Sequence, residues 1–279
     1  MPRRKKVEEA DIRKRIRAGF GSGEGPSYKP WETVHTFSSR GNSHRIFSVK
    51  TGRVHSLFSN IERALFLKAE YGNNFVDFQE QRAMEREHTL AFAKALGIKH
   101  SVFVGTKVPF VMTLDSVVVR RDDQGNLYRE AYDAKDSTAL LEERVLEKLS
   151  IHRMYCEHRG WKHTIVTEAT FDRQVIRNLE WIRAGARKPL EVMSQHGVFD
   201  ELPARMLIDI HAKRPHALVK DYCASFDVTH GLLPGTSLRV MQVLLWNHEL
   251  TPDLSAGPIH LASVASLLPE AAHYRLEAA

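Results

Sequence analysis

The chain has 279 residues, of which 43% are hydrophobic and 27% charged, so it is long enough to form two domains with separate cores. No apolar run approaches the ~20 residues that span a bilayer, and the first residues lack the apolar segment of a signal peptide. We therefore expect a cytoplasmic protein that does not enter a membrane. Two cysteines, Cys156 and Cys223, are too few for a disulfide framework.

Positive charge is concentrated at the start of the chain. The formal net charge is +6, and the first 55 residues hold 13 Lys and Arg against 5 Asp and Glu, so the remainder is slightly acidic. Such a basic segment is typical of a surface that binds nucleic-acid phosphates, although a solvated tail would explain the run from Arg3 to Lys6. Within the segment, we predict that Arg45, Lys50 and Arg53 contact DNA.

The first elements are expected to be short. Residues 7–19 can form a charged helix, and the glycine run at residues 19–26 breaks it. This run neither follows an apolar strand nor ends in Gly-Lys-Ser/Thr, so it is interpreted as a connector and not as a nucleotide loop. Residues 1–25 are therefore predicted to be a basic flexible leader. Partial period-two alternation in residues 44–58 predicts a basic hairpin.

The middle of the chain alternates helices and strands, the pattern of an α/β domain with a small mixed sheet. Ser59 to Glu62 has the form of a capping box, which predicts a helix at residues 61–71. The elements that follow are a strand at 75–78, a helix at 86–96, a strand at 110–120, a turn at 122–126, a strand at 127–134, a helix at 137–158 and a strand at 162–167. The strand at 110–120 is so apolar that we place it at the centre of the sheet.

Beyond Glu168 the sequence becomes mostly helical. The candidate helices are residues 171–182, 203–212, 216–226 and 237–248. In residues 250–261, Pro252, Gly257 and Pro258 stand where a short β-wing would turn. Residues 169–279 are therefore predicted to form a mainly α, winged-helix-like interaction domain.

Three ionisable side chains are predicted to meet at one edge of the sheet. Asp133 and Lys135 are two residues apart on a strand, so both leave the same face, and Asp115 lies in the neighbouring strand. Two carboxylates and an ammonium group there would suit Mg²⁺ held against a phosphodiester. The Asp-x-Lys spacing is weak alone, since a half-exposed strand end gives the same pattern. Asp115 carries more weight because a buried carboxylate needs a cation, either a metal or Lys135 in a structural ion pair.

Glu62 has two compatible roles. In a capping box it would bond the Ser59 amide, and a helix that begins over the sheet edge would also bring it near the other carboxylates. By contrast, Cys156, His158 and His163 lack the spacing of a zinc site.

With these residues placed, the chain resembles TnsA, the endonuclease subunit of heteromeric bacterial cut-and-paste transposases. The resemblance spans about residues 26–165 and rests on short motifs in order: Pro30-Trp31, Ser43-His44-Arg45-Ile46, Lys50-Thr51-Gly52-Arg53-Val54-His55, Ser59 to Glu62, Gln79-Glu80-Gln81, Gly97-Ile98-Lys99-His100, Thr113 to Asp115, and Lys135. It implies a restriction-endonuclease-like domain at residues 26–168, followed by a smaller winged-helix-like domain. The C-terminal third matches only in length and helical texture.

The resemblance also assigns roles to single residues. The family's catalytic acids and lysine fall on Glu62, Asp115 and Lys135. Asp133 stands where family members can carry glutamine, and it restores the Asp…Asp-x-Lys pattern of the wider nuclease superfamily. Glu62, Asp115 and Asp133 would hold one or two Mg²⁺, and Lys135 would orient the attacking water.

The function implied is Mg²⁺-dependent cleavage of the 5′ side of each transposon end. The implied partners are a TnsB-like transposase, which cuts and joins the 3′ ends, and a TnsC-like AAA+ ATPase regulator that docks mainly on the C-terminal domain. We expect a bacterial cytoplasmic protein that is nucleoid-associated when active. Two alternatives fit the same residues: a non-catalytic DNA-binding adaptor of a transposition complex, and a free-standing restriction or junction-resolving nuclease.

Overall fold

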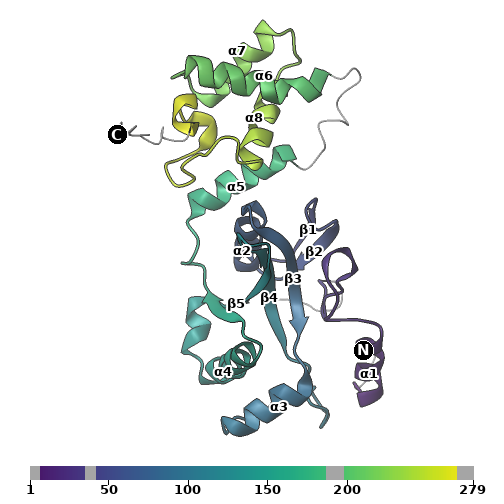
Figure 1. Cartoon of the computed structure of the whole chain (residues 1–279). Helices are drawn as coiled ribbons and strands as arrows, with labels where there is room; N and C mark the ends of the chain where they lie inside the picture. Colours follow the sequence, from purple (N-terminus) through teal and green to yellow (C-terminus); the bar gives the residue numbers. More distant parts are fainter. Residues whose placement is uncertain (1–6, 35–41, 187–197, 269–279) are drawn as a thin grey trace, which may run out of the picture. The chain divides into compact units, whose positions relative to one another are not determined.

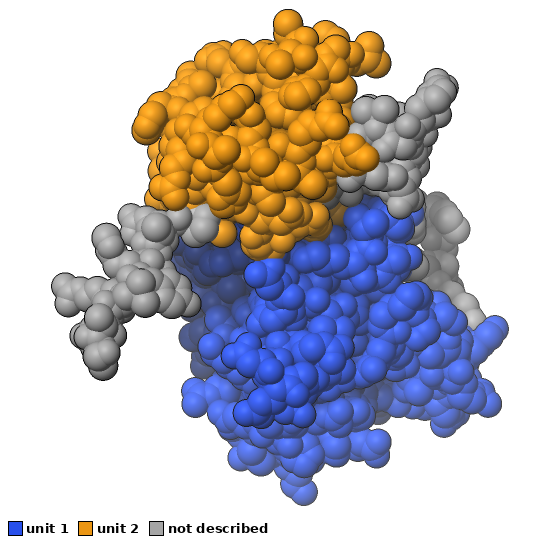
Figure 2. All heavy atoms as spheres, turned by 45° about the horizontal axis from the view of Figure 1, so that its top comes forward, with its two compact units in different colours: residues 1–171 blue, residues 172–279 orange. Residues whose placement is uncertain are grey.

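The computed structural model describes residues 7–34, 42–186 and 198–268. The chain divides into two compact units, Met1–Phe171 and Asp172–Ala279, which are coloured separately in Figure 2. The boundary predicted after residue 168 lies just before this division. None of the described helices is long and apolar enough to cross a membrane.

The first unit is built on a four-stranded mixed sheet (Figure 1). Its strands are β3 (Phe75–Ala83), β4 (Thr113–Arg121), β5 (Leu127–Ala134) and β6 (Lys162–Val166), in the order β3-β4-β5-β6. β3, β4 and β5 pair in antiparallel fashion, whereas β6 runs parallel to β5. β4 has a partner on both sides and its Val117, Val118 and Val119 are buried, which is why its sequence is so apolar. The predicted mixed α/β architecture is confirmed.

Three helices accompany the sheet: α2 (Asn60–Tyr71), α3 (Arg86–Ala95) and α4 (Glu143–His158). α2 packs through Phe66 on Phe78 of β3, with ring centroids 5.2 Å apart. α4 contributes Ile151 and Tyr155 to a core that includes Leu114. The start of α2, the start of β4 and the end of β5 lie in one region of this unit.

The helix predicted from residue 137 is two elements. Residues Ser137–Leu141 form a 3₁₀ helix, and α4 begins only at Glu143. Glu142 between them has an extended backbone (φ −85, ψ 118). The carboxylate of Glu168 accepts hydrogen bonds from the Ser137 amide and hydroxyl, which ties this turn to the end of β6 and separates it from α4.

The described part of the leader is folded onto the first unit. α1 (Glu9–Arg17) buries Ile12 in a cluster with Trp31. Gly21 has a φ of 73° and approaches β3 so closely that a Cβ at this position would lie 2.2 Å from that of Ala83. At Gly21 the run is therefore packed closely against β3 and is not the expected flexible connector, because only glycine permits both the backbone conformation and the approach. Residues 1–6 lie outside the described part.

The predicted basic hairpin is confirmed. β1 (His44–Ser48) and β2 (Arg53–Leu57) form a separate two-stranded antiparallel sheet in which Ser48 is opposite Arg53. β2 leads directly into the start of α2.

The described residues of the second unit are mainly helical, as expected. It contains α5 (Arg173–Ala186), α6 (Val198–Lys213), α7 (Val219–Thr229), α8 (Thr236–Trp246) and two short 3₁₀ helices, η4 (Ile259–Leu261) and η5 (Val264–Leu267). α6 begins five residues before the predicted start, so Pro203 stands inside the helix.

The β-wing predicted at residues 250–261 is not confirmed. Within residues 198–268 no strand is present, and this segment is irregular before η4. The Asn178 side chain donates to the carbonyls of Leu254 and Gly257 (2.9 and 2.7 Å) and accepts from the Ile259 amide (3.2 Å). The backbone of the segment is thus satisfied by a helical side chain and not by a second strand.

Candidate active site

A cavity of about 320 Å³ lies where the start of α2 meets the start of β4 and the end of β5. Three of the four predicted catalytic residues line it: Glu62, Asp115 and Lys135. Lys135 also borders a neighbouring cavity of about 450 Å³. Since both acids open into the smaller cavity, we take that one as the candidate active site.

Glu62 is held by the cap of its own helix. Its backbone amide donates to the Ser59 hydroxyl oxygen at 3.1 Å, and that hydroxyl donates back to Oε1 at 3.1 Å. The second carboxylate oxygen accepts from the Phe58 amide at 3.0 Å, one residue before the amide expected for a capping box. Burial, together with the nearby Asp115 carboxylate, raises the pKa of Glu62 to about 8. At neutral pH the protonated form of this carboxyl is therefore favoured unless a cation neutralises its charge.

Asp115 and Lys135 form an ion pair across β4 and β5. The Lys135 ammonium lies 2.5 Å from Asp115 Oδ2, which also accepts from the Ala134 amide at 2.9 Å. Burial would lower the pKa of Lys135, but the Asp115 and Asp133 carboxylates outweigh it and raise the pKa above its ordinary value. The Asp115 side chain is 20% exposed, more open than predicted for this apolar strand, because it faces the cavity.

Asp133 is close to this group and does not line the cavity. It is fully buried, and its Oδ2 lies 2.8 Å from both His152 Nδ1 of α4 and His163 Nε2 of β6. Its Oδ1 has no hydrogen-bond partner in the described residues. Burial alone would raise the pKa of Asp133, but the two imidazoles and Lys135 hold it below its ordinary value.

The structure therefore brings together three of the four predicted residues and sets the fourth behind them. Across the described ranges, no group of three or more His, Cys, Asp or Glu side chains is arranged to hold a metal ion. The catalytic and metal-binding roles of all four residues stay predictions.

Two of the three predicted DNA contacts are engaged within the protein. The Arg53 guanidinium pairs with Glu80 at 2.9 Å and its side chain is only 9% exposed. The Lys50 ammonium donates to the Glu70 and Gly72 carbonyls (2.5 and 3.3 Å) at the end of α2, and burial lowers its pKa. Arg45 and Lys50 are both exposed residues, but the Lys50 ammonium is taken up by these carbonyls, so Arg45 is the predicted contact whose side chain can reach a phosphate.

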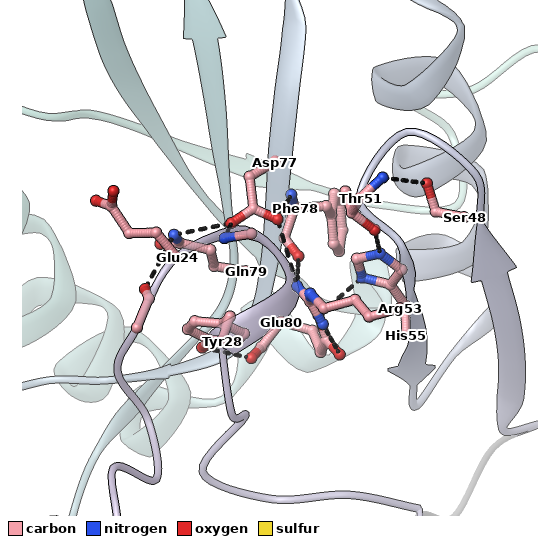
Figure 3. Close-up of polar contacts among 12 residues, drawn as sticks. Glu24, Tyr28, Ser48, Thr51, Arg53, His55, Asp77, Phe78, Gln79 and Glu80 are labelled. Carbon is pink, nitrogen blue, oxygen red and sulfur yellow. Dashed lines mark hydrogen bonds and ion pairs between the residues drawn. The ribbon is translucent and has the colours of Figure 1, made fainter.

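Glu80 of β3 is the centre of a buried polar network (Figure 3). One carboxylate oxygen lies 2.9 Å from His55 Nδ1, and the other accepts from Arg53 and from the Ser56 amide (2.9 and 3.2 Å). Thr51 bonds the second ring nitrogen of His55 at 2.8 Å. Burial would raise the pKa of Glu80, but His55 and Arg53 hold it below its ordinary value.

This network fixes the strand that leads to Glu62. It ties β2 to β3, and β2 ends at Leu57, one residue before the Phe58 amide that holds the Glu62 carboxylate. Tyr28, three residues after the leader, joins the network through its hydroxyl, which donates to the Glu80 carbonyl at 2.8 Å (Figure 3).

Sequence reasoning did not find the roles of His152, His163 and Glu80. Glu80 was noticed only as part of a motif, since the strand was predicted to end at residue 78. The physical signal was present all the same: a carboxylate inside a buried strand needs a cation, and that reasoning applies to Glu80 once β3 is extended to Ala83.

Comparisons with known proteins place both units of the chain in one protein family. The model of the family "TnsA-like endonuclease N terminal" matches residues 72–168, which include Asp115, Asp133 and Lys135 and exclude Glu62. The model "TnsA endonuclease C terminal" matches residues 172–254. The chain is also similar to the Transposon Tn7 transposition protein TnsA of Escherichia coli, with 34% identity over 241 residues that cover 86% of this chain and 84% of that protein.

The first unit is a mixed α/β unit in which Glu62, Asp115 and Lys135 line one cavity, and the two units match the models of the two parts of a TnsA endonuclease. The chain belongs to the TnsA family.

Proposed function

We propose that the chain is a Mg²⁺-dependent DNA endonuclease that cuts the 5′-side strand at transposon ends. The observation that carries this proposal is the meeting of Glu62, Asp115 and Lys135 in one cavity of a member of an endonuclease family. The order α2-β3-β4-β5-α4-β6, with β5 and β6 parallel, supports a restriction-endonuclease-like fold for the first unit.

The donor set of the cavity fits a hard divalent cation. Mg²⁺ is commonly bound by one or two carboxylates and keeps several waters, and Glu62 and Asp115 supply two. Burial and the nearby Asp115 carboxylate raise the pKa of Glu62, and a cation between the two acids would offset both effects by favouring the charged carboxylate. When bound, Mg²⁺ would act as a Lewis acid that polarises the scissile phosphate.

Asp133 stays a predicted third ligand. Its buried Oδ1 without a partner in the described residues is the atom that could serve, and the two histidines on Oδ2 would hold the carboxylate still. If it does not ligate, its carboxylate still favours the charged form of Lys135.

Lys135 supplies positive charge at the reacting phosphate. Its ammonium is anchored by Asp115 and the Ala134 carbonyl, which leaves one of its three protons for a phosphate oxygen or the attacking water. As water adds to phosphorus and the bond to the 3′ oxygen breaks, negative charge grows on the phosphate oxygens, and a fixed ammonium group stabilises it.

DNA and partner proteins complete the proposed function. Arg45 is the exposed predicted contact whose charge is not taken up by Glu80 or by the end of α2, and weak binding to phosphates suffices if a partner positions the chain. The relative is named a transposition protein of transposon Tn7, which supports action with a TnsB-like transposase and a TnsC-like ATPase in the bacterial cytoplasm. The helical second unit is the proposed docking site for the ATPase.

The test is strand-specific nicking of transposon ends by the full chain with its partner transposase and Mg²⁺. Asp115→Ala should abolish the 5′-side nick, whereas Asp123→Ala, in the exposed β4–β5 turn, should leave it unchanged. Unchanged nicking by Asp115→Ala would favour the adaptor alternative. Cleavage of arbitrary DNA by the chain alone would favour the free-standing nuclease.

A further inference from the structure

Gln81 has an unusual backbone conformation inside β3. Its φ is 48°, in the left-handed region of backbone conformation that residues other than glycine rarely adopt. The other described non-glycine residues with positive φ, Arg214 and His248, lie within two residues of the end of a helix, where such conformations are common. Gln81 is therefore the one case within the described residues that lies in a strand.

The surrounding structure forces this conformation. On either side of Gln81, Glu80 pairs with Ser116 and Arg82 pairs with Leu114 of β4. The Gln81 carbonyl accepts from the Trp31 amide at 3.1 Å, and Glu80 is anchored by its buried network (Figure 3). Strained residues that are held from both sides cluster at functional sites.

The Gln81 side chain faces the candidate active site. The register of β3 and β4 sets Gln81 opposite Asp115, and both line the cavity with Glu62 and Lys135. The Thr113 hydroxyl donates to Gln81 Oε1 at 3.0 Å. This bond orients the amide, and no described residue accepts a hydrogen bond from its Nε2.

A neutral donor is the suitable group at this place. The cavity is already lined by four acids, Glu32, Glu62, Asp115 and Asp136, and the ammonium of Lys135 is engaged by Asp115. An additional Lys or Arg would pair with the same acids and compete with a bound cation. An amide can donate to a phosphate oxygen without such competition, as Gln side chains do in DNA complexes.

We propose that Gln81 is a further substrate-contacting residue, whose side-chain Nε2 donates a hydrogen bond to a non-bridging oxygen of one phosphate at the cleavage site. This inference rests on the proposed nuclease function. It explains why the fold holds a glutamine in a left-handed strand position beside the acids.

The experiment uses the full chain with its partner transposase, Mg²⁺ and transposon-end duplexes. Gln81→Gly suits the left-handed backbone, so it removes the amide without adding strain. We expect its nicking rate to fall about 10- to 100-fold, the effect of a lost hydrogen bond to a charged group. Gln81→Asn, which also tolerates this backbone, should recover part of the loss. Gln124→Gly, in the exposed β4–β5 turn, is the matched control and should nick at the wild-type rate.

Duplexes with a single neutral methylphosphonate, placed in turn at each phosphate around the cut, identify the contact. At the contacted phosphate, the substitution should slow the wild type and add nothing to the Gln81→Gly defect, as in a double-mutant cycle. Losses that multiply at every phosphate, or wild-type nicking by Gln81→Gly, would overturn the proposal.

Folding and the proposed function are checked separately. The thermal unfolding midpoint of Gln81→Gly should equal or exceed that of the wild type, since the strain is relieved; a lower midpoint would assign Gln81 a structural role and overturn the inference. Nicking by Asp115→Ala would refute the proposed nuclease function itself. Inactive Asp115→Ala beside fully active Gln81→Gly would refute only the inference about Gln81.

Discussion

Glu80 and His55 are hydrogen bonded at 2.9 Å with both side chains wholly excluded from solvent. They join β3 to the hairpin that leads into α2. They therefore help to position Glu62 without contacting it. Arg53 closes the same network, and its charge would be left buried if the carboxylate were lost.

The first prediction concerns stability. Glu80→Ala should lower the free energy of unfolding by about 3–5 kcal/mol, the usual cost of leaving one partner of a buried ion pair. Glu157→Ala removes the partner of Arg153 in an exposed pair and should cost less than about 1 kcal/mol. Chemical denaturation at pH 7 measures both, and equal losses would contradict the central role given to Glu80.

The same network predicts a dependence on acid. His55 and Arg53 hold the pKa of Glu80 below its ordinary value against the effect of burial, while Asp77 competes for Arg53 at 3.6 Å. The unfolded chain therefore takes up this proton first as the pH falls. The extra stability of the wild type over Glu80→Gln should be complete above pH ~4.3 and shrink below it, as followed by urea titrations from pH 7 to 3. A gap that is constant over this range would refute the prediction.

For Glu62 we expect the opposite dependence of stability on pH. Burial and Asp115 raise its pKa to about 8, so the folded chain holds this proton more tightly than the unfolded one, and the wild type loses stability as the pH rises from about 4 to 8. In EDTA, Glu62→Gln should be more stable than the wild type at pH 8, by on the order of 2–4 kcal/mol, and similar to it near pH 4. The variant should not nick DNA. Equal stability of the two proteins at pH 8 would show that Glu62 is not strained by its surroundings.

Arg45 and Arg53 should separate DNA binding from folding. Arg45→Ala should weaken binding several-fold at low salt, reduce the salt dependence by about one phosphate contact and leave the unfolding midpoint unchanged, because its side chain is exposed. Arg53→Ala should instead destabilise the fold by about 3–5 kcal/mol. Fluorescence anisotropy with labelled duplexes and thermal unfolding distinguish the two effects; a normal midpoint for Arg53→Ala would restore its predicted role as a DNA contact.

Local patterns made much of the fold predictable. The apolar run of β4, the turn after it and the Ser59 cap each determine their element through short-range physics, so the positions of Asp115, Lys135 and Glu62 followed from sequence. The burial of Asp133 against His152 and His163 did not. That contact depends on how α4 packs over β5 and β6, which bring together residues 19 and 30 positions apart.

Two predictions are not confirmed, because in each case one sequence pattern allows two structures. A basic, aromatic-rich segment is expected both on a DNA surface and around buried acids, and Arg53 turned inward because Glu80 lies behind it. The proline and glycine residues at 250–261 also suit either a β-wing or a loop. The loop forms because the Asn178 side chain of α5 donates hydrogen bonds to two of its carbonyls.

The contact between Trp31 and Gln81 bears on the order in which the protein is made. Trp31 lines the same cavity as Asp115 and Lys135, yet it leaves the ribosome well before either. Its amide acquires its acceptor only when β3 is in place, and β3 is completed by pairing with β4. The segment synthesised first can therefore dock only after later strands have formed, and the cavity is not complete until most of the first unit has been translated.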